Sequence, residues 1–367
     1  SVTHRRLLGG CSNEAKRMLD AAKNTLSSLE WEYLKSVIAS IQEKYLSQAL
    51  LEKLQQVKEA LKKEQGTSYA YLRGDAPSKV VQASKKAFSF LTVNLCLMPE
   101  TGSMIYGGLL PWRVRIDAIT DKLKGLDPDI IFMQEAYDIH AIFELRMRLC
   151  ASYAHFYGNV TPRLFGFSHE SLWTSSGLAI ASKFKLEDVS FEPYATVTND
   201  TQITKYSGFD RLKVFGYDRN YGIFHCTVKN GREPLAHIAT THENPFFADV
   251  REKQTRQIIE SFKQKTKNLP LDVPFLLCGD LNIEKGDMTE GGEQLIKEHF
   301  AEHYSDGTTC IDFNNYWHKY LRNVKEFVES KHSPWTVDRA LLWAPWGKNN
   351  AYAMKVVRVI MNDIKKP

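Results

Sequence analysis

The chain has 367 residues, of which 43% are hydrophobic and 25% are charged. This composition is typical of a folded globular protein and excludes a disordered or fibrous chain. No stretch approaches the ~20 consecutive apolar residues of a membrane-spanning helix, and no complete signal peptide is visible. We therefore expect a soluble or peripheral membrane protein, whose compartment the sequence leaves unknown.

The positive charge is concentrated near the N-terminus. Residues 1–86 hold 15 Lys and Arg against 9 Asp and Glu, whereas residues 87–367 hold 33 against 34. A nucleic-acid-binding domain usually carries the basic excess itself, so the larger part of the chain is not expected to bind nucleic acid. The basic segment suits a membrane surface or an acidic partner, or is simply the solvated surface of helices.

Residues 13–65 have the periodicity of helices. Leu50, Leu54, Val57 and Leu61 fall on one apolar face, and Gly66 ends the pattern. We predict a helical N-terminal extension over residues 1–80, as a hairpin or one long helix. Docking to a partner, to a membrane or to the rest of the protein would each fit such a segment.

From residue 86 onward, short strands alternate with helices. We expect helices at 112–123, 139–149 and 250–265. Strands are expected at 88–97, 130–133, 178–182, 212–215, 222–228, 235–240, 275–278, 337–343 and 355–360. This mixture predicts an α/β or α+β layered domain over residues 86–367.

Polar residues stand where several predicted strands begin or end. They are Asn94, Glu135, His242, Asp280, Asn282 and Asp338. Layered α/β folds present the ends of their strands to a shared cleft, so we expect these side chains to meet.

Each of these residues also has a plain structural interpretation. Glu135 at the end of a buried strand suits Mg²⁺, which binds through one or two carboxylates and keeps several waters. Asp280 and Asn282 lie two apart, which places both on one face of an extended segment, unless they form an Asx turn. His242 alone would be structural and Asp338 a cap. No Walker loop, HExxH or GxSxG motif offers a competing hydrolytic scheme.

Taken in order, the motifs resemble the endonuclease/exonuclease/phosphatase superfamily, metal-dependent enzymes that cleave phosphoester bonds. The matching elements are Asn94, residues 129–135, residues 176–183, residues 207–209, Thr241 with His242, Arg251 with Gln254, residues 279–282 and residues 337–339. The resemblance implies a four-layered sandwich of two mixed β-sheets flanked by helices, preceded here by the helical N-terminal segment.

The resemblance also implies roles for the polar residues. Glu135, with Asn94 beside it, would hold Mg²⁺ or another divalent cation such as Mn²⁺. His242, Asn282 and Asn94 would bind the phosphate, and Asp280 would orient or deprotonate the attacking water. Asp338 would pair with a catalytic histidine.

The family carries that histidine in a Ser-Asp-His triplet near its C-terminus. No such triplet follows residues 355–360 of this sequence. We expect either that the catalytic domain is truncated before this motif or that the protein is a catalytically silent homologue that binds lipid without cleaving it.

Within the superfamily, residues 177–183 and the Gly-Phe pair at 208–209 are most similar to neutral sphingomyelinases, which hydrolyse sphingomyelin to ceramide and phosphocholine. The implied partner is a phospholipid at a membrane surface. Four aromatic residues are candidates for the lipid interface, with core packing as the alternative: Phe246, Phe247, Trp343 and Trp346.

Two other activities remain as hypotheses. Residues 334–339 are similar to a signature of inositol polyphosphate 5-phosphatases, which makes a phosphomonoesterase the second candidate, although Glu284 would repel a polyphosphate. A nuclease ranks third, because phosphate backbones call for a basic surface and residues 87–367 are nearly neutral.

Overall fold

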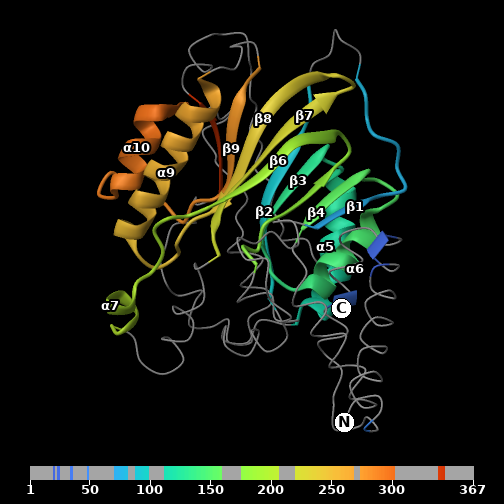
Figure 1. Ribbon diagram of the computed structural model, residues 1–367, viewed down its shortest axis with the longest axis horizontal. Helices are drawn as coiled ribbons and strands as arrows, with labels where there is room; N and C mark the ends of the chain where they lie inside the picture. Colours follow the sequence, from blue (N-terminus) through green and yellow to red (C-terminus); the bar gives the residue numbers. More distant parts are fainter. Residues whose placement is uncertain are drawn as a thin grey trace, which may run out of the picture.

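The computed structural model describes residues 70–81, 87–98, 111–158, 175–205, 220–267, 273–301 and 338–343, with six isolated helical residues in the N-terminal segment. These ranges form two mixed β-sheets packed face to face with helices on both outer sides (Figure 1), which confirms the predicted sandwich. Most of the predicted N-terminal helices and the predicted strands at 212–215 and 355–360 lie outside the described residues.

The first sheet has five strands in the order β1-β4-β5-β3-β2. They are β1 (Ala70–Arg73), β2 (Phe90–Leu97), β3 (Ile130–Ala136), β4 (His155–Gly158) and β5 (Ala179–Ser182). β2 and β3 run parallel, and every other pair is antiparallel. β1 belongs to this sheet although it lies within residues 1–80; the division into 1–80 and 86–367 stays a prediction.

The second sheet has six strands in the order β10-β11-β9-β8-β7-β6. They are β6 (Lys185–Pro193), β7 (Gly222–Asn230), β8 (Glu233–His242), β9 (Phe275–Asp280), β10 (Phe300–Ala301) and β11 (Asp338–Trp343). Here β8 and β9 are the parallel pair. Each sheet therefore contains one parallel pair within otherwise antiparallel pairing.

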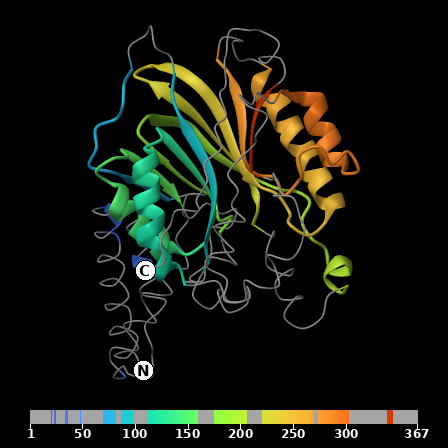
Figure 2. The ribbon, with the colours of Figure 1, turned by 180° about the vertical axis from the view of Figure 1, so that it is seen from behind.

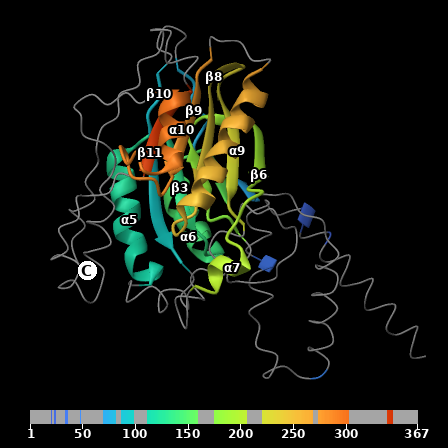
Figure 3. The same ribbon diagram turned by 90° about the vertical axis from the view of Figure 1, so that its left-hand side faces the viewer.

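A helix connects the two strands of each parallel pair, as parallel pairing requires. These are α5 (Trp112–Leu126) between β2 and β3, and α9 (Ala248–Thr266) between β8 and β9. α6 (Ile139–Leu149) packs beside α5, α10 (Gly291–His299) packs beside α9, and α7 (Asp200–Ile203) is short. The two helix pairs cover opposite sides of the sandwich (Figures 2 and 3), and no described helix is long and apolar enough to cross a membrane.

The sequence patterns explain these elements locally. On α5, the buried residues Trp112, Ile116, Ile119 and Leu123 follow a 4-3-4 spacing, which forms one apolar stripe. Helix α6 begins at the predicted residue because the Asp138 carboxylate accepts hydrogen bonds from two backbone amides of its first turn. The predicted strands that fall within the described residues are found at nearly the expected positions, but several run further, so that β3 includes Glu135 and β8 includes His242.

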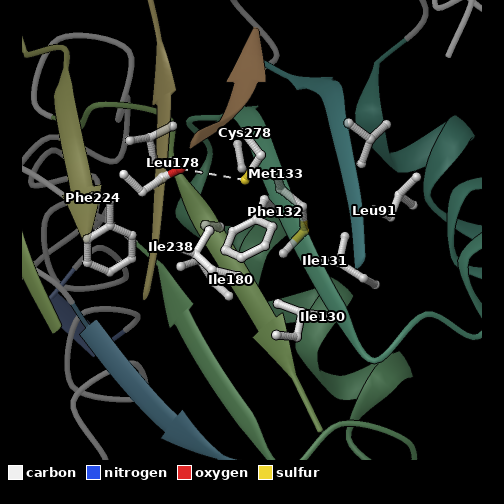
Figure 4. Packing of buried hydrophobic residues seen from close by; sticks show 14 of the residues in the cluster. Leu91, Ile130, Ile131, Phe132, Met133, Leu178, Ile180, Phe224, Ile238 and Cys278 are labelled. Carbon is white, nitrogen blue, oxygen red and sulfur yellow. Dashed lines mark hydrogen bonds between the residues drawn. The ribbon is translucent and has the colours of Figure 1, made fainter. Parts of the chain in front are cut away.

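The buried core consists of aliphatic, aromatic and sulfur-containing side chains (Figure 4). Phe132 and Ile238 are at most 1% exposed, and the Cys278 thiol donates to the Ala239 carbonyl at 3.6 Å. Burying one such large apolar side chain contributes about 1.5–3 kcal/mol.

Trp343 packs on two aromatic rings of this core: its ring centroid lies 5.4 Å from that of Phe262 and 5.1 Å from that of Phe300. Of its two predicted roles, core packing is therefore correct for Trp343, while Trp346 lies outside the described residues.

An ion pair is buried between α10 and the second sheet. Arg339 of β11 and Glu293 of α10 form a hydrogen-bonded pair, and both side chains are 0% exposed. The other oxygen of Glu293, Oε1, accepts a hydrogen bond from the Gly286 amide at 2.8 Å. This pair therefore attaches both β11 and the loop after β9 to the helical layer.

Replacing Glu293 by alanine should lower the free energy of unfolding by about 3–5 kcal/mol, because it leaves the Arg339 guanidinium buried without its carboxylate. Glu260→Ala is the matched control, since Glu260 forms an exposed pair with Lys263 on α9 and should cost less than about 1 kcal/mol. Urea denaturation of the three proteins measures both values. Equal losses in the two variants would show that the buried pair has no special stabilising role.

Candidate active site

The carboxyl ends of the two parallel strand pairs meet between the sheets. Asn94 near the end of β2 donates a hydrogen bond from Nδ2 to Oδ2 of Asp280 at the end of β9, at 3.1 Å. Both residues are 5% exposed. Two of the six predicted site residues, from opposite sheets and 186 positions apart in sequence, are thus in direct contact.

Glu135 reaches the same space through an irregular backbone. In a regular strand, Gln134 and Glu135 would point to opposite faces of the sheet. Gln134 points between the sheets, where its Nε2 donates to Thr240 Oγ1 of β8 at 3.3 Å. Glu135 also points there, since its Oε1 lies 4.0 Å from His242 Nε2. The left-handed backbone of Glu135, with φ of 53°, accounts for this departure from alternation.

His242, at the end of β8, lies between the two carboxylates. Its Nε2 is 3.8 Å from Oδ2 of Asp280 and 4.0 Å from Oε1 of Glu135. The imidazole is 2% exposed and stacks on the ring of Tyr221, with centroids 4.6 Å apart and planes inclined by 29°. The predicted convergence of Glu135, His242 and Asp280 is therefore found in the structure.

Asn282 is placed by a turn rather than by an extended strand. Its backbone amide donates to Oδ1 of Asp280 at 3.0 Å, and its φ is 50°. This is the Asx turn that the sequence left as an alternative, so the interpretation that both side chains share one face of a strand is wrong. The Asn282 side chain instead donates from Nδ2 to the backbone oxygen of Glu243 at 2.8 Å.

The approach of β9 to β8 depends on the glycine that precedes Asp280. Gly279 has φ of 146°, and a Cβ at this position would lie 2.1 Å from the Thr241 carbonyl oxygen. Only glycine allows β9 to lie so close to β8 here.

Asp338 is the first residue of β11 and pairs directly with Asp280 across the antiparallel ladder, while its side chain lies outside the described part of the chain. Its predicted pairing with a histidine stays a prediction.

Arg115 also belongs to this region, although it was not among the predicted site residues. Its side chain is 1% exposed, and its guanidinium donates to the carbonyl oxygens of Leu95 at 3.1 Å and Cys96 at 2.5 Å. These contacts support the end of β2, where Cys96 has φ of 47°. The available signal was the position of Arg115 on the apolar stripe of α5, between Trp112 and Ile119.

Glu243 is a second residue that sequence analysis did not identify. Its carboxyl is 0% exposed and accepts a hydrogen bond from Thr255 Oγ1 at 2.9 Å, and its second oxygen has no hydrogen-bond partner among the residues that the structure describes. Burial raises the pKa of Glu243 to about 8. The acid that adjoins the catalytic candidate His242 is therefore mainly neutral at pH 7.

The predicted metal-binding residues fit a hard divalent cation. The described residues contain no cluster of three or more His, Cys, Asp or Glu arranged to hold a metal. Mg²⁺ does not require one, because it binds through one or two carboxylates and keeps several waters. Glu135 and Asn94 both offer oxygen donors, as Mg²⁺ and Mn²⁺ prefer. Oδ1 of Asn94 accepts from the Cys96 amide at 3.1 Å, which leaves that oxygen one further lone pair.

Comparison with known proteins assigns the class. The sequence profile of the Endonuclease/Exonuclease/phosphatase family matches residues 102–352, so the chain belongs to this family. The enzymes in that description act on phosphoester bonds, which agrees with the polar residues gathered between the sheets. No curated protein matches the chain by sequence.

Solved structures share the fold at low sequence identity. A β-hairpin deletion mutant of beta toxin from Staphylococcus aureus is 17% identical, with a TM-score of 0.54 over 74% of this chain and 92% of its own. Sphingomyelinase C from Streptomyces griseocarneus is 18% identical, with a TM-score of 0.52 over 74% and 88%. A further beta toxin mutant from S. aureus, at 17% identity and TM-score 0.51 over 74% and 88%, has bound magnesium ions.

Glu243→Gln should become more stable relative to the wild type as pH rises from about 5 to 8. A glutamate in the unfolded chain ionises near pH 4.5, whereas folding raises the pKa of Glu243 to about 8. Between these values only the folded state retains the proton, so the wild type loses stability as pH rises, and glutamine does not titrate. Urea denaturation at pH 5 and pH 8 measures the difference. A difference that is independent of pH would contradict the raised pKa.

Proposed function

We propose that this protein is a Mg²⁺-dependent phosphodiesterase that hydrolyses a phospholipid head group, with sphingomyelin as substrate and ceramide and phosphocholine as products. The observation that carries the proposal is the position of the His242 imidazole between the sheets. Its Nε2 lies 4.0 Å from a carboxylate oxygen of Glu135 and 3.8 Å from one of Asp280. A carboxylate for the metal, an imidazole for the phosphate and a second carboxylate for water are the groups that phosphodiester hydrolysis needs.

In this proposal Glu135, with Asn94 beside it, holds the cation. The cation, when bound, neutralises charge on a phosphoryl oxygen while the ester bond breaks. His242 donates an N–H to a phosphoryl oxygen from its Nε2 edge, which faces the two carboxylates. Asn282 uses one amide N–H on Glu243 O, and its second N–H is directed to the phosphate.

Asp280 acts on the nucleophile. Its Oδ1 is held by the Asn282 amide and its Oδ2 by Asn94, so the carboxylate is fixed in orientation. It accepts a hydrogen bond from the attacking water and orients it towards phosphorus. The water oxygen forms the new bond to phosphorus and gives its proton to Asp280. The bond from phosphorus to the ceramide oxygen breaks, and that oxygen takes up a proton from solvent, so that ceramide leaves as an alcohol. Asp338, opposite Asp280 in the ladder, stays assigned to a histidine partner.

The choice of substrate rests on two supports. The motif set of the sequence resembles neutral sphingomyelinases, and a sphingomyelinase is among the solved structures with this fold. A phosphoinositide phosphatase or a silent lipid-binding homologue would use the same fold with different loops.

Sphingomyelin, a phosphoinositide and DNA should therefore be assayed with the full chain, each with Mg²⁺ and with chelator. Mg²⁺-dependent release of phosphocholine is the expected result, and turnover of the phosphoinositide or of DNA alone would overturn the proposed substrate.

Glu135→Gln should abolish Mg²⁺-dependent turnover and weaken Mn²⁺ binding by more than about tenfold, because the neutral amide removes the charge that holds the cation. Electron paramagnetic resonance of Mn²⁺ measures binding in the absence of substrate. Glu144→Gln, which alters a partly exposed carboxylate on α6, is the control and should change neither value. Unchanged Mn²⁺ affinity in Glu135→Gln would remove Glu135 from the metal site.

Phe247→Ala should weaken binding to sphingomyelin vesicles several-fold. Phe246 and Phe247 are half-buried between β8 and α9, and both backbone amides donate to Asn244 Oδ1. Phe246 packs partly on the core, which makes Phe247 the better test of a lipid contact. Met147→Ala is the matched control, because Met147 is 49% exposed on α6, on the opposite side of the sandwich (Figure 1). Equal vesicle sedimentation for all three proteins would assign Phe247 to packing alone.

A further inference from the structure

Two buried tyrosines lie behind the imidazole of His242. The ring of Tyr221 stacks on His242 at a centroid distance of 4.6 Å, and Tyr221 is 1% exposed. The hydroxyl of Tyr221 shares a 2.5 Å hydrogen bond with the hydroxyl of Tyr137, which is 0% exposed. The imidazole of His242 is therefore in contact with the ring of Tyr221, and the hydroxyl of Tyr221 is held in turn by Tyr137.

The tyrosine pair connects the two halves of the site. Tyr137 lies two residues after Glu135, and its amide donates at 3.2 Å to the carbonyl of Leu97, the last residue of β2. Tyr221 lies just before β7, and its carbonyl oxygen accepts from the Tyr194 amide at 2.9 Å. The link therefore runs from the metal-binding end of β3 to the second sheet, where His242 lies.

The packing of Tyr137 gives a physical reason for the glycine at position 177. This residue is part of the Ser-Gly pair at 176–177 that resembles the family motif. Gly177 has φ of 72°, and a Cβ there would lie 2.6 Å from Cε1 of Tyr137. The Gly177 carbonyl also accepts from the Ala136 amide at 2.8 Å. A side chain at position 177 would therefore displace the Tyr137 ring and, through the shared hydrogen bond, the ring of Tyr221.

We propose that Tyr221, held by Tyr137, is a positioning residue that fixes the plane of the His242 imidazole. A stacked imidazole cannot swivel about its χ2 torsion without losing the ring contact, so Nε2 stays directed towards Glu135 and Asp280. Alignment of this kind matters, because a displacement of ~1 Å in a catalytic group can cost about 100-fold in rate. The expected effect on kcat rests on the proposed phosphodiesterase function. The orientation of the His242 ring, in contrast, can be measured without turnover.

Three variants separate the ring contact from the hydroxyl link. Tyr221→Leu removes both, whereas Tyr221→Phe and Tyr137→Phe keep the rings and remove the hydrogen bond. With sphingomyelin in mixed micelles and Mg²⁺, we expect Tyr221→Leu to lower kcat by about 10–100-fold with KM changed less than about threefold. The two phenylalanine variants should retain kcat within about fivefold, because the stacked ring remains.

Tyr153→Leu is the matched control for the loss of a buried tyrosine. Tyr153 is 0% exposed and donates to the Pro128 carbonyl at 2.8 Å, near the amino end of β3 and so remote from His242. We expect it to lower the melting temperature but to leave kcat per folded molecule unchanged. If Tyr153→Leu lowers kcat as much as Tyr221→Leu does, the effect is general packing and the proposal is overturned.

The second readout is the His242 signal in the NMR spectrum of metal-free, substrate-free protein with ¹³C-labelled histidine. His242→Gln assigns the signal by its disappearance. The stacked Tyr221 ring should shift the His242 Cε1–H resonance upfield; Tyr221→Leu should remove this shift, and Tyr221→Phe should preserve it. An unchanged signal in Tyr221→Leu would overturn the proposal. Absence of turnover in the wild type, with the ring-current result as expected, would instead count against the proposed function alone.

Discussion

The hydrogen bond from Asn94 to Asp280 marks the contact on which the site depends. Asn94 lies near the carboxyl end of one parallel strand pair and Asp280 at the carboxyl end of the other, and each pair lies in a different sheet. The second sheet supplies His242 and Asp280, and the first sheet supplies Asn94 and Glu135; only the face-to-face packing of the two sheets brings these four side chains together. The apolar core between them therefore has a functional consequence, because Phe132, Ile238 and their neighbours set the distance between the strand ends.

Irregular backbone at the strand ends then aims the side chains. Cys96, Glu135 and Asn282 all have φ between 47° and 53°, a conformation that costs a non-glycine residue free energy. Local contacts stabilise two of them: Arg115 binds the carbonyl of Cys96, and Asp280 accepts from the amide of Asn282. Ordinary strand geometry would direct Glu135 away from His242. The left-handed backbone of Glu135 at the end of β3 thus brings a carboxylate of the first sheet to His242 of the second.

The sequence was sufficient to predict the layered fold and the polar strand ends, because strand periodicity and the order of the motifs are local properties. It could not predict how Glu135 turns, since alternation points the other way, and it left the Asx turn at Asn282 as one of two alternatives. Tyr221 and Glu243 were missed for a different reason. An aromatic residue before a strand and an acid after one are common patterns, and only the three-dimensional structure shows the stacking on His242 and the complete burial of Glu243.

Charge at the site follows from the same geometry. Glu135 and Asp280 place two carboxylates within 4.0 and 3.8 Å of His242, and a phosphodiester brings a further negative charge. Repulsion among these groups would oppose binding unless a divalent cation lies between them. Glu243 would add a third charge, but its burial raises its pKa to about 8 and keeps it mainly neutral near pH 7. Burial of Glu243 therefore limits the charge that the proposed cation would have to balance, which suits the few protein ligands proposed for it.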